Sequence, residues 1–312
     1  ILGLSRDTNH KEIYESKIRN SEIPNNNPIH NWESFVLRFM RDRYSSFVRL
    51  TGCFMTCRYP DWHDNWVPRA LKLVQNEDWD AVISTGGPYS VHRVGLGIKK
   101  QSPNVYWIVD WRDLWTDNPI YHGIPIFWPI EKRLEKRFHK SCDLITCVTQ
   151  KSSKVLEQKA GGKVEVVYNG FDPDNYKSSR QCSLLSNKSA LNIAFTGTFS
   201  SKYRLPSLLF EAMHELKIER KINSHDLKLT FVGHNTQELG PYVSKYELNE
   251  YCDLFGLVPR EDALSLQRCC DILLFSENER IVKDVMSGKI FEYLFSMTPI
   301  WAFGISESSE VG

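Results

Sequence analysis

The stretch that decides the fold is Gly-Lys-Ile-Phe-Glu-Tyr-Leu at residues 288–294, followed by Pro299 and Ile300. It is typical of a loop, a short helix, a turn and the start of a strand. Lys289 and Glu292 are three residues apart, so a helix places both on one face near its N-terminus. Unpaired N–H groups and partial positive charge at a helix N-terminus suit a diphosphate, and a nearby carboxylate can bind ribose hydroxyls. The stretch therefore predicts a nucleotide-diphosphate site, with an ordinary solvated Lys/Glu pair as the alternative.

Apolar runs and helical periodicity alternate along the rest of the chain. The first expected series comprises helix 64–76, strand 79–85, helix 90–100, strand 105–110, helix 130–140, strand 143–148, helix 151–158 and strand 164–167. The second comprises strand 191–195, helix 205–218, strand 227–232, helix 242–250, strand 252–255, helix 260–268, strand 271–275, helix 289–294 and strand 299–302. Residues 1 to 45 are expected to be irregular, with one candidate helix over 32–43.

Two such series predict two α/β domains, each a doubly wound, Rossmann-like parallel sheet with helices on both faces. The chain has 312 residues, which is enough for two domains of ordinary size. Residues 171–190 form the expected connection, because the sequence is polar over 180–189. Ligands of such sheets bind outside the carboxyl ends of the strands, so a central cleft between the domains is the expected ligand site.

Composition excludes some classes of protein. The 39 Lys and Arg residues against 38 Asp and Glu residues give a net charge of +1, which argues against a nucleic-acid binder that works by bulk charge. No run of apolar residues is long enough for a transmembrane helix. The eight cysteines form no C-x-x-C pair and the histidines show no ligand spacing, so we expect reduced, buried thiols and no metal site.

Four motifs on these elements resemble those of the retaining GT-B glycosyltransferases of group 1, family 4. They are Asp-Ala-Val-Ile-Ser-Thr-Gly-Gly-Pro-Tyr-Ser at 80–90, Asp-Trp-Arg-Asp-Leu-Trp at 110–115, Val-Tyr-Asn-Gly-Phe-Asp at 167–172 and Lys-Ile-Phe-Glu-Tyr-Leu at 289–294. The resemblance covers about residues 60 to 304. It implies a GT-B fold with an acceptor-side domain at 1–175 and a nucleotide-sugar-binding domain at 176–312. Since the family opens with a strand and a Gly-rich loop and continues beyond the last motif, both ends of this chain are expected to be shortened.

The resemblance also implies an activity. It is the transfer of a sugar from a nucleotide-diphosphate donor to a glycan or lipid-linked acceptor, with retention, without a metal and without a cofactor besides the donor. Such a hexosyltransferase belongs to polysaccharide biosynthesis, in the cytoplasm or at the inner face of the membrane. The alternatives are a sugar-nucleotide 2-epimerase of the same fold and an inactive glycan-binding subunit. A dinucleotide dehydrogenase is disfavoured, because no G-x-G-x-x-G follows a strand.

The resemblance assigns most donor-binding residues. Lys202 and Arg204 follow the strand that ends near Gly197, where the family carries basic phosphate ligands, although ordinary loop charges remain the alternative. Lys289 supplies a cation for the leaving diphosphate, and Glu292 binds the ribose.

Other donor-side candidates are assigned from their positions in the sequence. Asp284 occupies the first position of a pair of acids with seven residues between them, and the alternatives for this sugar-side carboxylate are Glu277 and Glu279. Gly86 and Gly87 end a strand and allow close approach of the backbone to a ligand, although any tight turn also uses glycine.

Arg112 and Asp113 follow a strand and are the catalytic candidates beside Asp284. Asp113 can orient or deprotonate an acceptor hydroxyl, whereas Arg112 can equally hold Asp113 in a structural pair. His92 is expected to be structural more often than functional, and no nucleophile is assigned. Three tryptophans either line the acceptor side or pack in the core: Trp111, Trp115 and Trp128.

Helix 130–140 is rich in cations. It carries Lys132, Arg133, Lys136, Arg137, His139 and Lys140. A solvated face is the ordinary interpretation, and a peripheral contact with anionic membrane lipid is the alternative.

Overall fold

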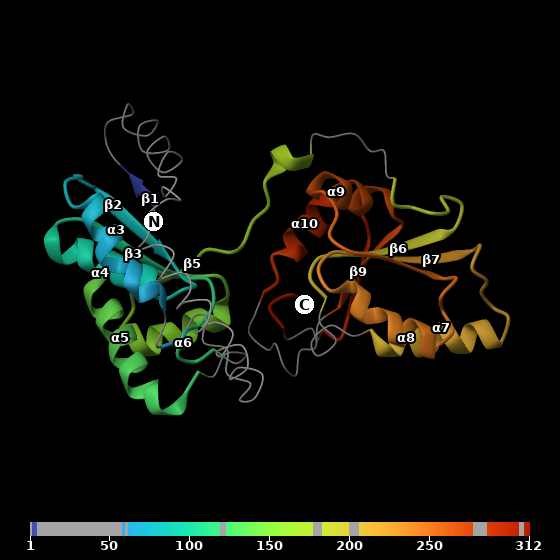
Figure 1. The fold of residues 1–312 in the computed structure, drawn as a ribbon, viewed down its shortest axis with the longest axis horizontal. Helices are drawn as coiled ribbons and strands as arrows, with labels where there is room; N and C mark the ends of the chain where they lie inside the picture. The colour runs from blue at the N-terminus through green and yellow to red at the C-terminus, as the bar shows by residue number, and fades with distance from the viewer. Residues whose placement is uncertain are drawn as a thin grey trace, which may run out of the picture. The chain divides into compact units, whose positions relative to one another are not determined.

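The computed structural model describes residues 2–4, 58–59, 62–118, 123–176, 183–199, 206–276, 286–305 and 309–312. It divides into two compact units, Ile1–Tyr168 and Asn169–Gly312 (Figure 1). The division expected between residues 175 and 176 falls inside a short 3-10 helix of the second unit, η3 (Pro173–Tyr176). The acceptor-side and donor-side roles expected of the two parts stay predictions.

The first unit contains a five-stranded sheet in the order β1-β2-β3-β4-β5. Its strands are β1 (Leu2–Leu4), β2 (Ala81–Thr85), β3 (Tyr106–Trp111), β4 (Leu144–Cys147) and β5 (Val164–Val166). Neighbouring strands from β2 to β5 are parallel, as the alternating pattern predicts. The expectation of irregular structure at the N-terminus is wrong for β1, which pairs antiparallel with β2. A three-residue strand is too short to show a period of two, so only its partner strand defines it.

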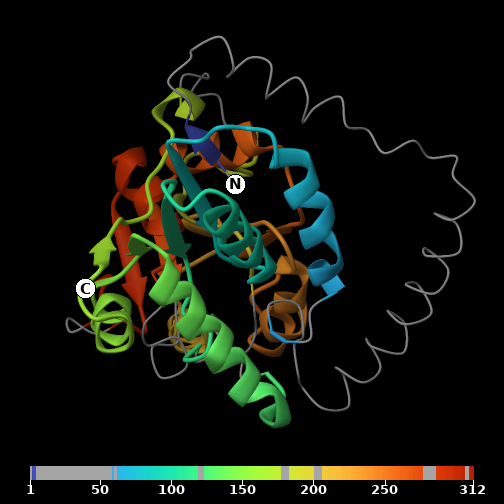
Figure 2. The ribbon, with the colours of Figure 1, turned by 90° about the vertical axis from the view of Figure 1, so that its left-hand side faces the viewer.

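Helices follow the strands of the first unit. They are η1 (Trp62–Trp66), α3 (Val67–Val74), α4 (Ser90–Gln101), η2 (Pro125–Phe127), α5 (Trp128–Ser141) and α6 (Gln150–Ala160). Local signals set their ends: the Thr149 side chain accepts from the Ser152 amide at the start of α6, and Gly161 ends it in the left-handed region. Contacts join α3 to α4, α4 to α5 and α5 to α6 (Figure 2).

The second unit contains a fully parallel sheet in the order β10-β9-β6-β7-β8. Its strands are β6 (Leu191–Thr196), β7 (Leu227–Val232), β8 (Cys252–Phe255), β9 (Ile272–Ser276) and β10 (Ile300–Phe303), and its α-helices are α7 (Ser207–Ile218), α8 (Gly240–Lys245), α9 (Arg260–Cys269) and α10 (Lys289–Ser296). Figure 1 shows α7 and α8 on one face of the sheet and α9 and α10 on the other.

Alternating residues of β6 explain why both faces are covered. Ile193 and Phe195 pack in a cluster with buried residues of α7 and α8, whereas Ala194 packs in a second cluster with Tyr293 of α10. Successive side chains of a strand point to opposite faces, so an apolar run such as this one needs helices on both sides. The predicted Rossmann-like architecture is therefore present in this unit.

One helix lies elsewhere than expected. The expected helix over 242–250 is replaced by η4 (Thr236–Leu239) and α8, which ends at Lys245. Pro241 lies in the first turn of α8, a position that favours helix initiation. Glu247 adopts a left-handed backbone with φ of 54°, which prevents the helix from continuing to residue 250.

The strand order of the second unit reverses at β6. The chain moves from β6 to β7 on one side and later to β9 on the other, so β6 and β9 are neighbours at the point where the order reverses. Pairing of β6 with β7 continues to Thr196, but pairing with β9 covers only Ile193 and Ala194. Sheets of this kind bind ligands at the carboxyl ends of the strands beside such a reversal.

The sequence also led to expectations about membrane-spanning helices and about cysteine side chains. Among the helices of the described segments, none has the length and apolar character needed to cross a bilayer. Five cysteines fall within those segments and are free thiols: Cys142, Cys147, Cys252 and Cys270 are buried, and Cys269 is intermediate.

Candidate functional site

A pocket of about 60 Å³ opens at the carboxyl ends of β2 and β3 in the first unit. The pocket is lined by Arg58, Gly86, Gly87, Tyr89, Trp111, Arg112, Asp113, Leu114, Trp115 and Asn118. The structure thus brings together the four site residues that the sequence nominated from two separate motifs and two tryptophans that it considered for the acceptor side. The other lining residues were not nominated, and no sequence pattern links Arg58 to residues more than fifty positions later.

At Gly86 and Gly87 the backbone itself forms part of the pocket lining. The Gly86 amide donates to the Asp110 carbonyl over 2.8 Å. A Cβ atom on Gly86 would lie 3.3 Å from that carbonyl and 3.4 Å from Trp111 Cε3, which is tighter than most real contacts. Gly87 has φ of 71°, a conformation that side chains disfavour. The Gly-Gly turn is therefore required by local packing, whether or not a ligand binds there.

Three aromatic rings stack along the pocket, and all three also pack in the core, with Tyr89 1%, Trp111 2% and Trp115 4% exposed. The Tyr89 and Trp115 ring centroids are 4.5 Å apart, and those of Trp115 and Trp111 are 5.9 Å apart, with interplanar angles of 20° and 17°. Trp128, the third tryptophan considered for this role, lies on α5 and is 41% exposed. Apolar rings with a few convergent polar groups are typical of small-molecule sites.

Asp113 is the carboxylate of this pocket and Arg112 is its neighbour. Loss of hydration raises the pKa of the Asp113 carboxyl from its ordinary value, and the positive charge of Arg112 opposes part of that rise. A carboxyl whose pKa is raised in a concave site is a candidate for proton transfer.

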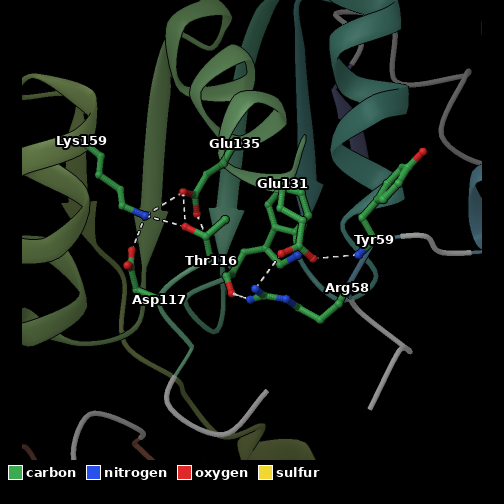
Figure 3. Close-up of polar contacts among 8 residues, drawn as sticks. Arg58, Tyr59, Thr116, Asp117, Glu131, Glu135 and Lys159 are labelled. Atoms are coloured by element: carbon green, nitrogen blue, oxygen red, sulfur yellow. Dashed lines mark hydrogen bonds and ion pairs between the residues drawn. The ribbon is translucent and has the colours of Figure 1, made fainter. Parts of the chain in front are cut away.

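A buried ion pair holds the loop that forms the pocket wall (Figure 3). Arg58 donates to the Trp115 carbonyl and, over 2.7 Å, to Oε2 of Glu131 on α5. The backbone N–H of Tyr59 donates to the other Glu131 oxygen over 2.8 Å. Only 3% of the Arg58 side chain and none of the Glu131 side chain is exposed. Burial raises the pKa of Glu131, and the Tyr59 hydrogen bond and the Arg58 charge oppose that rise.

The next turn of α5 holds the same loop a second time. Glu135 accepts from the Thr116 hydroxyl over 2.6 Å and from Lys159 of α6 over 2.7 Å. Lys159 also donates to Thr116 and pairs with Asp117 (Figure 3). Both glutamates of α5 therefore point inward and hold the segment 115–117. The sequence signal that could have revealed their burial is the spacing of four between them, which places them on the same helix face as buried Phe138.

Two buried histidines lie behind the pocket. Nδ1 of His92 is 2.8 Å from the Ser84 hydroxyl, which also accepts from the Trp107 indole over 2.9 Å. His139 accepts from the Trp111 indole over 3.0 Å. Burial, followed by the charge of His139, lowers the pKa of His92 to about 3. These contacts give His92 a structural role beneath the pocket.

Acid should therefore destabilise the first unit through His92. Its ordinary pKa of 6.5 falls to about 3 in the folded chain. The unfolded state consequently binds more protons between these pH values, so stability is lost as the pH falls through that window. In His92→Asn, which keeps a hydrogen-bond acceptor near Ser84, the slope of unfolding free energy against pH should be smaller. Denaturant unfolding at several pH values between 6.5 and about 3 measures this slope. The control is His225→Asn, which changes an exposed histidine and should keep the slope of the wild type. Equal slopes for His92→Asn and the wild type would contradict the role given to His92.

In the second unit, Lys289 lies at the end of β6. It is the first residue of α10, and its ammonium nitrogen lies 4.2 Å from the centroid of the Phe195 ring. A Cβ atom on Gly197 would lie 2.4 Å from Lys289 Cε, and Gly197 has φ of 128°. Gly233, at the end of β7, is equally constrained, since its Cβ would lie 2.2 Å from the Gly197 carbonyl oxygen. Because Gly197 and Gly233 have no side chain, Lys289 can pack against Gly197 and Gly197 can pack against Gly233.

Tyr293 fixes α10 against β6 where the pairing of β6 with β9 ends. Its hydroxyl accepts from the Thr196 amide over 2.9 Å and lies 3.3 Å from the Thr196 carbonyl. Gln267 of α9 donates to the Thr196 hydroxyl over 2.8 Å. Burial raises the pKa of Tyr293 to about 12, so the phenol stays a neutral hydrogen-bonding group. The position of Lys289 therefore follows from a buried network that the sequence motif did not reveal.

Glu292 has a partner that sequence reasoning missed. Arg260, at the start of α9, donates to Glu292 Oε1 over 2.7 Å. The Arg260 side chain is 58% exposed and that of Glu292 is 22% exposed. An exposed pair of this kind is weak and can exchange partners, so the carboxylate is not committed to the arginine.

The remaining nominated residues lie outside the described part of the chain. They are Lys202, Arg204, Asp284 and the alternatives Glu277 and Glu279. Within the described ranges, no group of three or more His, Cys, Asp and Glu side chains is arranged to hold a metal ion.

Comparisons with known proteins agree with this arrangement. Residues 34–175 match the family model of Glycosyltransferase Family 4. The structure is similar to sucrose-phosphate synthase from Thermosynechococcus elongatus, with a TM-score of 0.56 and 12% identity over 78% of this chain and 62% of that one. It is similar to trehalose-6-phosphate synthase OtsA, with a TM-score of 0.51 and 14% identity over 77% and 60% of the two chains.

A third similar structure is described as a UDP-N-acetylglucosamine 2-epimerase from Listeria monocytogenes, with a TM-score of 0.51 and 14% identity over 79% and 62% of the two chains. The chain thus spans about three fifths of the length of these structures. No curated protein sequence matches significantly. At these identities the likeness shows the fold, and it confirms the predicted resemblance to GT-B proteins.

Proposed function

From the GT-B-like fold and the match of residues 34–175 to the Glycosyltransferase Family 4 model, we propose that this chain transfers a sugar from a nucleotide-diphosphate donor to a glycan or lipid-linked acceptor. The single observation that carries the proposal is the position of Lys289. Its cation lies at the N-terminus of α10 and over Phe195 at the end of β6, beside the reversal of strand order. Leaving diphosphates are stabilised by such a combination of a cation and a helix N-terminus.

The donor is proposed to bind to the second unit. Lys289 and the N–H groups at the start of α10 face the diphosphate, and Gly197 and Gly233 allow it to approach the strand ends. Glu292 exchanges Arg260 for the ribose hydroxyls. Lys202, Arg204 and Asp284 remain proposed ligands of the phosphates and the sugar. Because basic groups supply the charge that the leaving group needs, the proposed reaction is metal-free, and the family resemblance supports retention and hexosyl transfer.

The acceptor is proposed to bind to the pocket of the first unit. Asp113 orients or deprotonates the attacking hydroxyl, and the buried stacked rings support the pocket wall behind it. The positive charge of Arg112 opposes part of the rise that burial causes in the pKa of that carboxyl. A role in polysaccharide biosynthesis, in the cytoplasm or at the inner membrane face, follows as part of the same proposal.

A thermal-shift panel of UDP, GDP, ADP and CDP sugars tests the donor site. One nucleotide class should raise the unfolding temperature, because a ligand that binds only the folded state stabilises it. Glu292→Ala should remove that shift, whereas Glu215→Ala, which removes an exposed carboxylate of α7, should retain it. The absence of a shift with every nucleotide class would contradict the proposal.

Product analysis separates this function from the alternatives. Transfer yields a lengthened acceptor and a free nucleoside diphosphate. An epimerase of the same fold would convert the donor sugar without any acceptor, and an inactive glycan-binding subunit would bind without turnover.

A further inference from the structure

The surface of α5 separates its charges completely. Its exposed charged residues are all cations: Lys132, Arg133, Lys136, Arg137 and Lys140. Its two acids, Glu131 and Glu135, are buried and bonded to Arg58 and Lys159, which lie outside the helix (Figure 3). The apparently mixed sequence therefore presents five positive charges and no negative charge on the exposed face of this helix.

The cations also stand beside one another. Lys132, Lys136 and Lys140 are spaced by four, as are Arg133 and Arg137, so they form rows of like charge on the helix surface. Like charges at this spacing repel each other and weaken a helix. In the described part of the chain, no ion pair involves any of the five. The helix thus carries an electrostatic cost that an anionic partner would relieve.

Exposed apolar side chains lie at the start of the same helix. Ile126 of η2 is 77% exposed, and Trp128 and Ile130 of α5 are 41% and 37% exposed. Tryptophan and aliphatic side chains beside a basic stripe are typical of segments that lie in the headgroup region of a bilayer. A soluble polyanion such as RNA would attract the cations but would gain nothing from Ile126 and Ile130.

We propose that this α5 surface binds an anionic lipid bilayer, with the cations on headgroup phosphates and Ile126 and Trp128 at the interface. The inference deepens the proposed function, on which it rests for its meaning: it names the membrane as the place where a lipid-linked acceptor is met. The acceptor pocket and the α5 surface share one rigid link, because Glu131 and Glu135 hold the pocket loop from the inner face of this helix.

Vesicle flotation of the full chain tests the proposal. The probes are phosphatidylcholine vesicles with and without phosphatidylglycerol. Binding should require the anionic lipid and weaken with salt. The triple change Lys132→Gln, Lys136→Gln and Lys140→Gln should lower affinity by about a hundredfold, since each cation near an anionic surface contributes about fivefold.

A charge-matched control removes three exposed lysines of the second unit: Lys188→Gln, Lys221→Gln and Lys245→Gln. It should bind vesicles like the wild type. Ile126→Gln should weaken the binding that remains at high salt, where apolar contact dominates. Equal binding by wild type and the α5 triple variant, or binding to neutral vesicles, would overturn the proposal, as would capture of RNA but not of vesicles.

Failure here is distinguishable from failure of the proposed function. The nucleotide-sugar thermal shift depends on the second unit, so the α5 triple variant should show it unchanged, and its own unfolding temperature reports whether it folds. Loss of vesicle binding with an intact nucleotide shift supports the membrane role. A nucleotide shift without any vesicle binding by the wild type leaves the transferase proposal standing and refutes the membrane surface.

Discussion

Replacing Lys289 by alanine should reduce the catalytic efficiency of sugar transfer by about two to three orders of magnitude, the range for removal of a pre-organised group that stabilises developing charge. The Lys289 cation lies 4.2 Å from the Phe195 ring centroid at the N-terminus of α10. The atoms nearest to a Cβ on Gly197 all belong to Lys289, so the leaving diphosphate would lose this charge. Initial rates at varied donor concentration measure the effect.

A matched control comes from the same unit. Lys245→Ala removes another lysine that lies over an aromatic ring, 4.7 Å from the centroid of Tyr246. It should leave the rate of transfer unchanged, because α8 is remote in sequence and packs on the other sheet face. Lys289→Ala should also weaken binding of the nucleoside diphosphate much more than binding of the nucleoside. Equal rates for the two alanine variants would contradict the role given to Lys289.

Replacing Glu131 by alanine should destabilise the protein by about 3–5 kcal/mol, the usual cost of breaking a buried ion pair from one side. Arg58 would keep its charge in a site where only 3% of its side chain is exposed, and the Tyr59 N–H would lose its acceptor. Denaturant unfolding of the first unit measures the loss. Glu131→Gln should fall between the alanine variant and the wild type, because it retains an acceptor but no charge.

The control for that change is Glu157→Ala on α6. Glu157 is an exposed residue that accepts a single side-chain hydrogen bond, from Ser153 over 2.9 Å. Its loss should cost about 1 kcal/mol or less. If Glu131→Ala cost no more than Glu157→Ala, the buried pair would not hold the pocket loop in place.

Particular elements show how far the sequence alone could predict the fold. Strands β7 and β8 have the bounds expected from the sequence, 227–232 and 252–255. Both segments are mostly apolar, as strands of a parallel sheet covered on both faces require, so their limits are visible in the sequence. The end of α8 was not visible, because tertiary packing placed Glu247 in a left-handed conformation within a segment whose side chains otherwise favour a helix.

The candidate site likewise contains residues that the sequence could predict and residues that it could not. Sequence motifs nominated Gly86, Arg112 and Asp113, and the structure places them around one pocket. Motifs could not supply Arg58, since its place in the pocket depends on contacts with distant segments. They could not reveal that Glu292 pairs with Arg260, because only the packing of α9 against α10 brings these residues together.

By itself, the sequence determined the alternation of strands and helices, the two-part organisation and the helix that starts at Lys289, because hydrophobic periodicity and helix signals are local properties of the chain. Only the tertiary structure decided which charges are buried. Glu131 and Glu135 point inward because Arg58 and Lys159 meet them there, and the lysines and arginines between them are left on the surface. Burying a carboxylate requires a partner, and that partner comes from a segment far away in the chain.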